Sequence, residues 1–164
     1  MTTPPHLLVI GYGNTLRGDD GVGPRTVEAV GTLRLPQVRT LICHQLSPEH
    51  SAPVSQAHTV IFVDAAVGPA AGGVQWRALA PGHSSQLLAH AADPCTLLAL
   101  ARDVFGRAPA AWWLTIPAVN LDFGEELSPA ATAGLSEALR RIKALADQFC
   151  HADDKICDAV ANPR

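Results

Sequence analysis

A glycine-rich segment with two adjacent aspartates, residues 11–23, constrains the fold of this chain more than any other feature. It follows an apolar run, residues 7–10, and precedes a helix-like segment that begins near Pro24. This order predicts a first strand, a long tight turn and a first helix. Turns of this kind often bind phosphate through backbone N–H groups, but Asp19 and Asp20 would repel an anion and favour a cation.

The spacing of the glycines argues against a dinucleotide site. A turn of the form G-x-G-x-x-G needs its third glycine at position 16, which is Leu16. The residues alone leave two alternatives: a cation site, or a strand-to-helix turn in which Asp19 or Asp20 caps the helix. We expect a structural role for Asp19, bonding to N–H groups of the turn, and expect Asn14 to fix the turn through side-chain hydrogen bonds.

The composition limits the class of protein. With 164 residues, 48% of them hydrophobic, the chain is expected to form one domain with a sizeable core. Charged residues make up 16%, the formal net charge is -3 and no basic stripe is present, so nucleic acid is not an expected partner. No apolar run approaches the ~20 residues that span a bilayer, and no basic segment precedes the first apolar run, so neither a membrane partner nor a signal peptide is expected. The four cysteines form no C-x-x-C pair, which fits a reducing cytoplasm.

Predicted strands and helices alternate along the chain. We expect strands at 6–11, 38–44, 59–63, 74–79 and 112–116, and helices at 22–31, 48–57, 94–105 and from 129 to about 149. The alternation predicts an α/β fold whose mainly parallel sheet of about five strands is covered on both faces, with 74–79 as an edge strand that can run antiparallel. Residues 1–150 form the domain, and the polar residues 151–164 are expected to be a flexible tail.

Three side chains are candidates for one metal site. Ligands of parallel sheets bind beyond the carboxyl ends of the strands, which is where the first turn and Asp64, at the end of the third predicted strand, should lie. Asp20, Asp64 and His90 together offer two carboxylates and one imidazole, a set that suits nickel or zinc. Taken singly, Asp20 can be a helix cap, Asp64 a loop cap and His90 an exposed loop histidine, for which His83 is a competitor.

The common signatures of other hydrolases are missing. Neither H-E-x-x-H nor G-x-S-x-G occurs in the sequence, and no cysteine–histidine pair has a catalytic spacing. A bound metal would polarise a peptide carbonyl and help to deprotonate water. Asp20 and Asp64 could also activate water directly, and the sequence leaves both mechanisms open.

The first segment, G-Y-G-N-x-L-R-G-D-D-G-V-G, resembles the N-terminal signature of the hydrogenase maturation endopeptidases. These enzymes trim the C-terminus of nickel–iron hydrogenase large subunits. The resemblance covers roughly residues 6–146 and includes, in the family's order, residues 60–65, His90 with Pro94 and 97–101, and 123–129. Residues 44–46, His-Gln-Leu, resemble the branch that serves NAD-linked, bidirectional hydrogenases.

The resemblance implies a three-layer α/β/α sandwich and a specific activity. The implied enzyme, sometimes classed as an aspartic-type endopeptidase, removes the C-terminal extension of a hydrogenase large-subunit precursor after nickel insertion. The implied metal ligands are Asp20, Asp64 and His90, and Asp20 occupies a position where the family often has the longer glutamate.

Two further expectations follow from the resemblance. The metal is nickel supplied by the substrate, although zinc or another divalent cation can take its place in a crystal. The turn is shaped by Gly11, Gly13, Asn14, Asp19 and Gly21.

Two other functions are alternatives to the endopeptidase. They are a nucleotide- or flavin-binding α/β module and a metal-sensing maturation chaperone that does not cleave.

Overall fold

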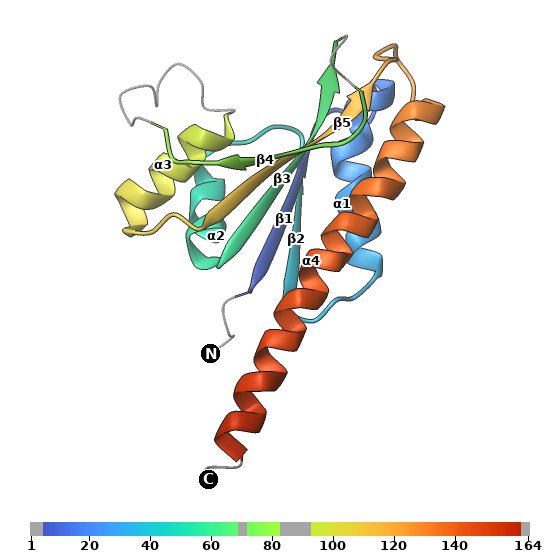
Figure 1. Cartoon of the computed structure of the whole chain (residues 1–164). Coiled ribbons are helices and arrows are strands. Elements are labelled where there is room, and N and C mark those ends of the chain that lie inside the picture. Colours follow the sequence, from blue (N-terminus) through green and yellow to red (C-terminus); the bar gives the residue numbers. More distant parts are fainter. Residues whose placement is uncertain (1–4, 69–71, 83–92, 162–164) are drawn as a thin grey trace.

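A computed structural model describes residues 5–68, 72–82 and 93–161 of the chain, with side chains as far as Phe149. The strands are β1 (Leu7–Tyr12), β2 (Val38–Cys43), β3 (Thr59–Val67), β4 (Gln75–Leu79) and β5 (Ala110–Ala118). The helices are α1 (Val22–Thr32), α2 (Ser51–Gln56), α3 (Pro94–Phe105) and α4 (Pro129–Ala161), and short 3₁₀ turns η1 (Gly18–Gly21) and η2 (Pro48–His50) precede α1 and α2 (Figure 1).

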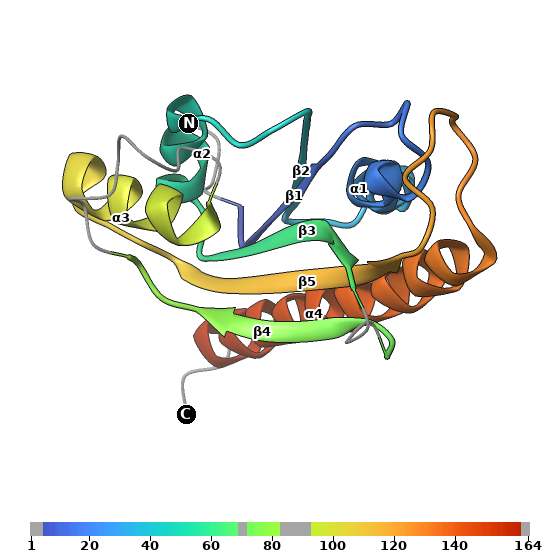
Figure 2. The same cartoon turned by 90° about the horizontal axis from the view of Figure 1, so that it is seen from above.

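The strands form a single sheet in the order β2-β1-β3-β5-β4. All neighbouring strands run parallel except β4, which pairs antiparallel with β5 at one edge. Helices α1 and α4 cover one face of the sheet and α2 and α3 cover the other, as Figure 2 shows from above. The predicted α/β/α sandwich, its five strands and its antiparallel edge strand are therefore confirmed.

The core consists of two layers because successive side chains of a strand point to opposite faces of the sheet. In β3, Ile61 and Val63 pack on the α1/α4 face, whereas Val60 and Phe62 pack on the α2/α3 face. All four are fully buried. A strand buried on both faces needs a continuous apolar run, and each such side chain contributes about 1.5–3 kcal/mol to folding.

Several helix ends are fixed by capping residues that act locally. Asp93 caps α3 by accepting a hydrogen bond of 3.2 Å from the backbone N–H two residues later. The Ser128 hydroxyl accepts a hydrogen bond of 3.2 Å from the N–H of Ala131, three residues later, at the start of α4, and Ser47 forms a capping box before η2. Gly106 ends α3 in the left-handed conformation, with φ of 74°.

The third strand is longer than predicted, and this changes the setting of Asp64. We expected the strand to end at Val63, but β3 continues to Val67. Pairing with β1 stops at Val63, whereas pairing with β5 continues to the last residue of the strand. Asp64 is therefore inside β3, at the point where the strand loses its neighbour on the β1 side.

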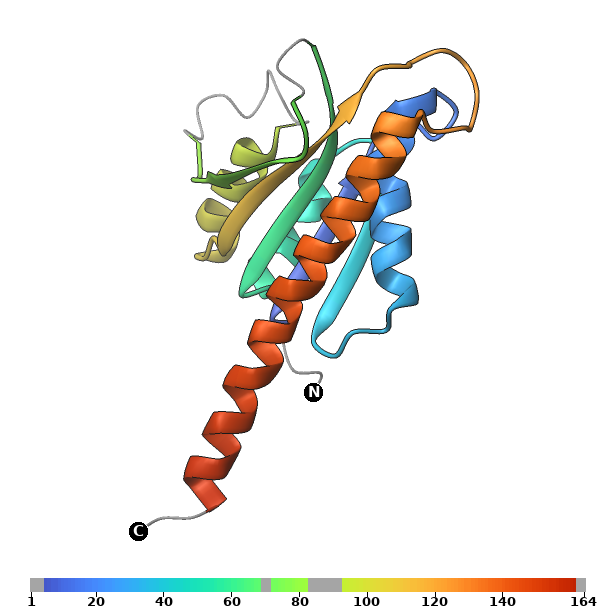
Figure 3. The same cartoon turned by 45° about the vertical axis from the view of Figure 1, so that its right-hand side comes forward.

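The last helix is also longer than predicted. Helix α4 continues beyond Phe149 to Ala161, because residues 150–161 contain neither glycine nor proline. Figure 3 shows the end of this helix extending past the sheet. The flexible tail at 151–164 stays a prediction. Within the described ranges, no helix has the length and apolar character that crossing a membrane requires.

Candidate functional site

The turn after β1 fixes Asp20 through its own backbone. The Asp20 carboxylate accepts a hydrogen bond of 2.8 Å from the N–H of Asn14, whose side chain accepts one of 3.0 Å from the N–H of Leu16. Gly13 has a φ of 140°, and a β-carbon there would lie 2.0 Å from the Asp20 carbonyl oxygen. Side chains would also collide with backbone at Gly11 and Gly21. The glycines therefore allow the chain to fold tightly around Asp20.

Asp19, in η1, has a different environment, because its side chain points to the loop between β5 and α4. Its side chain is fully buried and accepts hydrogen bonds of 2.8 and 3.0 Å from the N–H groups of Val119 and Asn120. The N–H and hydroxyl of Ser128 each donate a further bond of 2.7 Å. Burial alone would raise the pKa of Asp19, but these hydrogen bonds outweigh it and lower the pKa below its ordinary value.

Backbone pairing strengthens this junction between the two loops. The N–H of Gly18 donates to the carbonyl of Gly124 at 2.8 Å, and the N–H of Gly124 donates to the carbonyl of Leu16 at 2.9 Å. We expected Asp19 to bond to N–H groups of its own turn, but its partners lie about a hundred residues later in the chain. Sequence reasoning missed these partners because the contact is not local.

Asp64 projects from β3 toward the α2/α3 face and is only partly buried. Burial raises its pKa to about 6; hydrogen bonds from the Tyr12 hydroxyl and the Ala65 N–H oppose this rise, and the negative charge of Asp20 adds to it. Because the charge of Asp20 raises the pKa of Asp64, the two carboxyl groups are near enough to interact electrostatically. The turn after β1 and the open part of β3 thus bring two acidic groups to the carboxyl edge of the sheet.

Tyr12 is a site residue that sequence reasoning did not single out. It is 9% exposed, and burial together with Asp64 raises the pKa of its hydroxyl well above the ordinary value. The hydroxyl therefore stays protonated and donates to Asp64. Alternation along β1 was the available signal, because Leu8, Ile10 and Tyr12 share the face on which Asp64 lies.

The metal prediction concerns one residue that the structure does not describe. His90, like its competitor His83, lies outside the described residues. Within the described ranges, no group of three histidine, cysteine, aspartate or glutamate side chains could hold a metal. Asp20 and Asp64 provide two hard oxygen donors, which fit part of the coordination shell of a divalent cation.

The remaining described histidines and cysteines have other surroundings. The carbonyl of His44 accepts a hydrogen bond of 3.1 Å from Gly13, the ring of His50 belongs to the cap of η2, and His58 stacks on His6. Burial, with a contribution from a nearby glutamate, raises the pKa of Cys43 to about 11, so its thiol is protonated at neutral pH.

Comparison with known proteins gives agreement at the level of structure. No family model matches the sequence, and no curated protein matches it. The hydrogenase maturating endopeptidase HybD from E. coli is a solved structure with a TM-score of 0.69 and 21% identity, over 88% of this chain and 93% of that chain. The [NiFe] hydrogenase maturation protease HybD from Thermococcus kodakarensis has a TM-score of 0.66 and 20% identity, over 86% and 99%.

A third solved structure, a hydrogenase 2 maturation peptidase from a Thaumarchaeota archaeon, has a TM-score of 0.62 and 23% identity, over 85% of this chain and 97% of that chain. The three similarities extend over nearly the whole of each solved chain, so the common structure is a complete domain rather than a single motif. This chain therefore has the fold of the hydrogenase maturation proteases.

Proposed function

We propose that this protein is an endopeptidase that removes the C-terminal extension of a nickel–iron hydrogenase large-subunit precursor after nickel insertion. The observation that carries the proposal is that Asp20 and Asp64 lie at the carboxyl edge of the sheet, near enough for the charge of Asp20 to raise the pKa of Asp64. The similarity of the fold to maturation proteases and the N-terminal signature support the same function. The proposed partner is the precursor, and the proposed location is the cytoplasm.

The chemistry follows from the two carboxyl groups. In the proposed reaction, Asp20, Asp64 and His90 would hold the nickel that the precursor already carries, and a metal held there would supply the Lewis acidity that favours attack on the scissile carbonyl. Asp20 is held by the N–H of Asn14, so its position is fixed before the substrate arrives. In the alternative mechanism without a metal, Asp64, whose pKa burial raises to about 6, could accept a proton from water near neutral pH.

The same geometry argues against a nucleotide-binding module. A phosphate at the first turn would need free backbone N–H groups, but the N–H of Asn14 already donates to Asp20. The neighbouring carboxylate of Asp64 would repel the phosphate further. Absorbance of the purified protein tests the flavin alternative directly, and a bound flavin would contradict the proposal.

The proposal includes a narrower assignment to the branch that serves NAD-linked, bidirectional hydrogenases. It rests on residues 44–46, which follow β2 beside the first turn. Buried Leu46 fixes this segment on the α2/α3 core. Incubating the protein with precursors from NAD-linked and from other hydrogenases tests the assignment, because only the former should be shortened.

The decisive experiment compares two forms of one precursor, nickel-loaded and nickel-free. Each is mixed with the protein, and its shortening is followed by gel shift and mass spectrometry. Only the loaded form should be cut, and Asp20→Ala should prevent the cut. Equal cutting of both forms would leave a sequence-specific peptidase in which the aspartates activate water. No cutting of either form would favour the chaperone alternative.

A further inference from the structure

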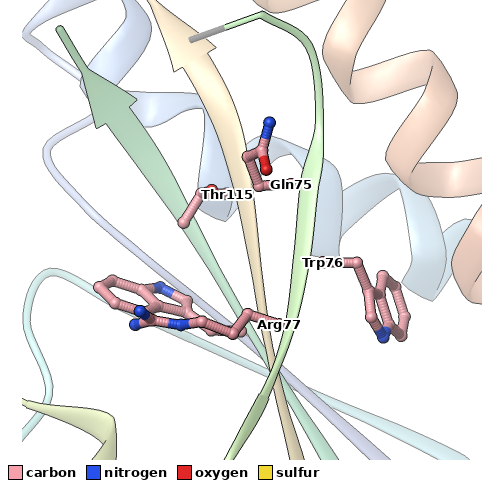
Figure 4. A pocket seen from close by; sticks show the side chains of 5 residues that line it. Gln75, Trp76, Arg77 and Thr115 are labelled. Carbon is pink, nitrogen blue, oxygen red and sulfur yellow. The ribbon is translucent and has the colours of Figure 1, made fainter. Parts of the chain in front are cut away.

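A pocket of about 260 Å³ opens between β4 and β5. It is lined by Gln75, Trp76, Arg77, Trp113 and Thr115 (Figure 4). Strand register connects it to the site, because Thr115 pairs with Asp64 on one side and with Gln75 on the other. Paired residues project to the same face of a sheet. Asp64, Thr115 and Gln75 therefore form a continuous row from the acidic groups into the pocket.

Arg77 supplies the positive charge of this pocket. Its guanidinium carbon lies 4.9 Å from the centre of the Trp113 ring, a cation–π arrangement that restrains the side chain. Among the described residues, none forms an ion pair with Arg77. The segments 69–71 and 83–92, which flank β4 in the sequence, contain no aspartate or glutamate. The guanidinium therefore has donors available for a planar anion such as a carboxylate.

The charges on the two sides of the row are opposite. Asp20 and Asp64 make one end of the row negative, whereas Arg77, two residues along β4 from Gln75, gives a positive charge near the other end. A peptide lying across the row would be oriented by this difference. An acidic group would be repelled from the aspartates and attracted to Arg77, while a neutral peptide bond would lie at Asp64.

Sheet geometry gives the spacing between Asp64 and Arg77. Arg77 is two strands across and two residues along from Asp64, which is roughly 12 Å at ~4.8 Å per strand and ~3.4 Å per residue. An extended peptide advances about 3.3–3.6 Å per residue. Asp64 and Arg77 are thus separated by the length of about three to four extended peptide residues.

We propose that this pocket binds a carboxylate of the peptide substrate, three to four residues from the scissile bond, with Arg77 as the recognising group. Gln75 and Thr115 hold the intervening peptide on the row. This inference rests on the proposed endopeptidase function. The carboxylate belongs either to an aspartate or glutamate side chain or to the C-terminus of the extension, since both present the same planar acceptor.

Binding can be measured without cleavage, using three acetylated peptides: Gly-Gly-Glu-Gly-Gly amide, pentaglycine with a free carboxylate, and pentaglycine amide. The indole N–H signals of the full chain are followed by NMR during titration. At least one carboxylate peptide should bind about ten-fold more tightly than the neutral peptide, and the tighter one identifies the source. The free energy of a charge-assisted hydrogen bond is large enough for this ratio.

Variants of the arginine give the specific test. Arg77→Gln should remove the preference for carboxylate, and Arg77→Lys, which keeps the charge but loses the planar fork, should retain part of it. Arg39→Gln is the matched control, because Arg39 is also exposed on an edge strand but lies at the opposite side of the sheet. Equal binding of all three peptides, or an unchanged preference in Arg77→Gln, would overturn the proposal.

Cleavage of the nickel-loaded precursor separates this inference from the proposed function. Arg77→Gln should raise KM about ten-fold and leave kcat nearly unchanged, because the arginine binds substrate away from the scissile bond. Unchanged KM and kcat would remove the pocket from substrate recognition. Failure of the wild-type protein to cleave would instead contradict the endopeptidase function, whatever the peptides show.

Discussion

Asp19 lies in the turn after β1, and Asp64 lies in β3 beside that turn. The environments of the two carboxylates are opposite. Asp19 is fully buried, accepts four hydrogen bonds and has a lowered pKa, because its partners compensate for the loss of water. Asp64 is partly buried, lies near a second carboxylate and has a pKa raised to about 6. Asp19 therefore stabilises the fold by holding two loops together, whereas burial and the charge of Asp20 destabilise the charged form of Asp64. A carboxylate destabilised in this way is typical of functional sites.

The largest expected effect is on cleavage, through Asp64. We predict that Asp64→Asn lowers cleavage of a nickel-loaded precursor at least a thousand-fold, because the amide can neither accept a proton nor provide an anionic ligand. The circular dichroism spectrum should stay close to that of the wild type. Cleavage at a normal rate by this variant would remove Asp64 from the chemistry and weaken the contrast with Asp19.

The next largest effect is on stability, through Asp19. Asp19→Ala removes the buried acceptor of four hydrogen bonds and leaves the N–H groups of Val119, Asn120 and Ser128 without this partner. We predict a loss of about 3–5 kcal/mol in the free energy of unfolding, measured by urea denaturation.

Asp122 provides the matched control for this experiment. It lies in the same loop between β5 and α4, and its side chain is exposed. Asp122→Ala should change the free energy of unfolding by less than about 0.5 kcal/mol. A similar loss in both variants would mean that the loop, rather than the buried carboxylate, is sensitive to substitution.

The parts of this molecule that sequence could predict are those governed by local rules. The caps at Asp93 and Ser128 depend on residues a few positions away, and an aspartate or serine directly before a proline is a local signal for the start of a helix. The sheet rule also placed Asp20 and Asp64 at one edge, because it needs only the order of strands and helices. Their role as metal ligands, with His90, stays a prediction.

The parts that were missed depend on contacts between distant segments. The extension of β3 beyond Val63 depends on its pairing with β5, and the partners of Asp19 lie in the loop before α4. The pocket beside Asp64 needs the antiparallel register of β4 and β5, which places Arg77 opposite Trp113. No periodicity or motif in one segment encodes the register between two strands.

A moderate effect is expected on the pH dependence of stability in metal-free protein. The pKa of Asp64 rises from an ordinary value of 3.8 to about 6 on folding, so its protonated form is favoured in the folded state. Its contribution to stability is full below about pH 4 and is lost as the pH rises through 6. Asp64→Asn should therefore be more stable than the wild type by up to about 2 kcal/mol at pH 7.5. The difference, measured by urea denaturation in the presence of chelator, should shrink toward pH 4; a constant difference would argue against the raised pKa.

The smallest expected effect concerns Tyr12, which donates a hydrogen bond to Asp64. Tyr12→Phe keeps the buried ring and removes only the hydroxyl, so we predict a loss of about 0.5–1.5 kcal/mol in the free energy of unfolding. This hydrogen bond stabilises the charged carboxylate, and its loss should therefore raise the pKa of Asp64 above 6. Carbon-13 NMR titration of the Asp64 carboxyl group measures that change, and the carboxyl group of Asp19 in the same spectra serves as the internal control. A lowered or unchanged pKa of Asp64 would show that Tyr12 only fills space, and Asp64 would then owe its raised pKa to burial and Asp20 without an opposing hydroxyl.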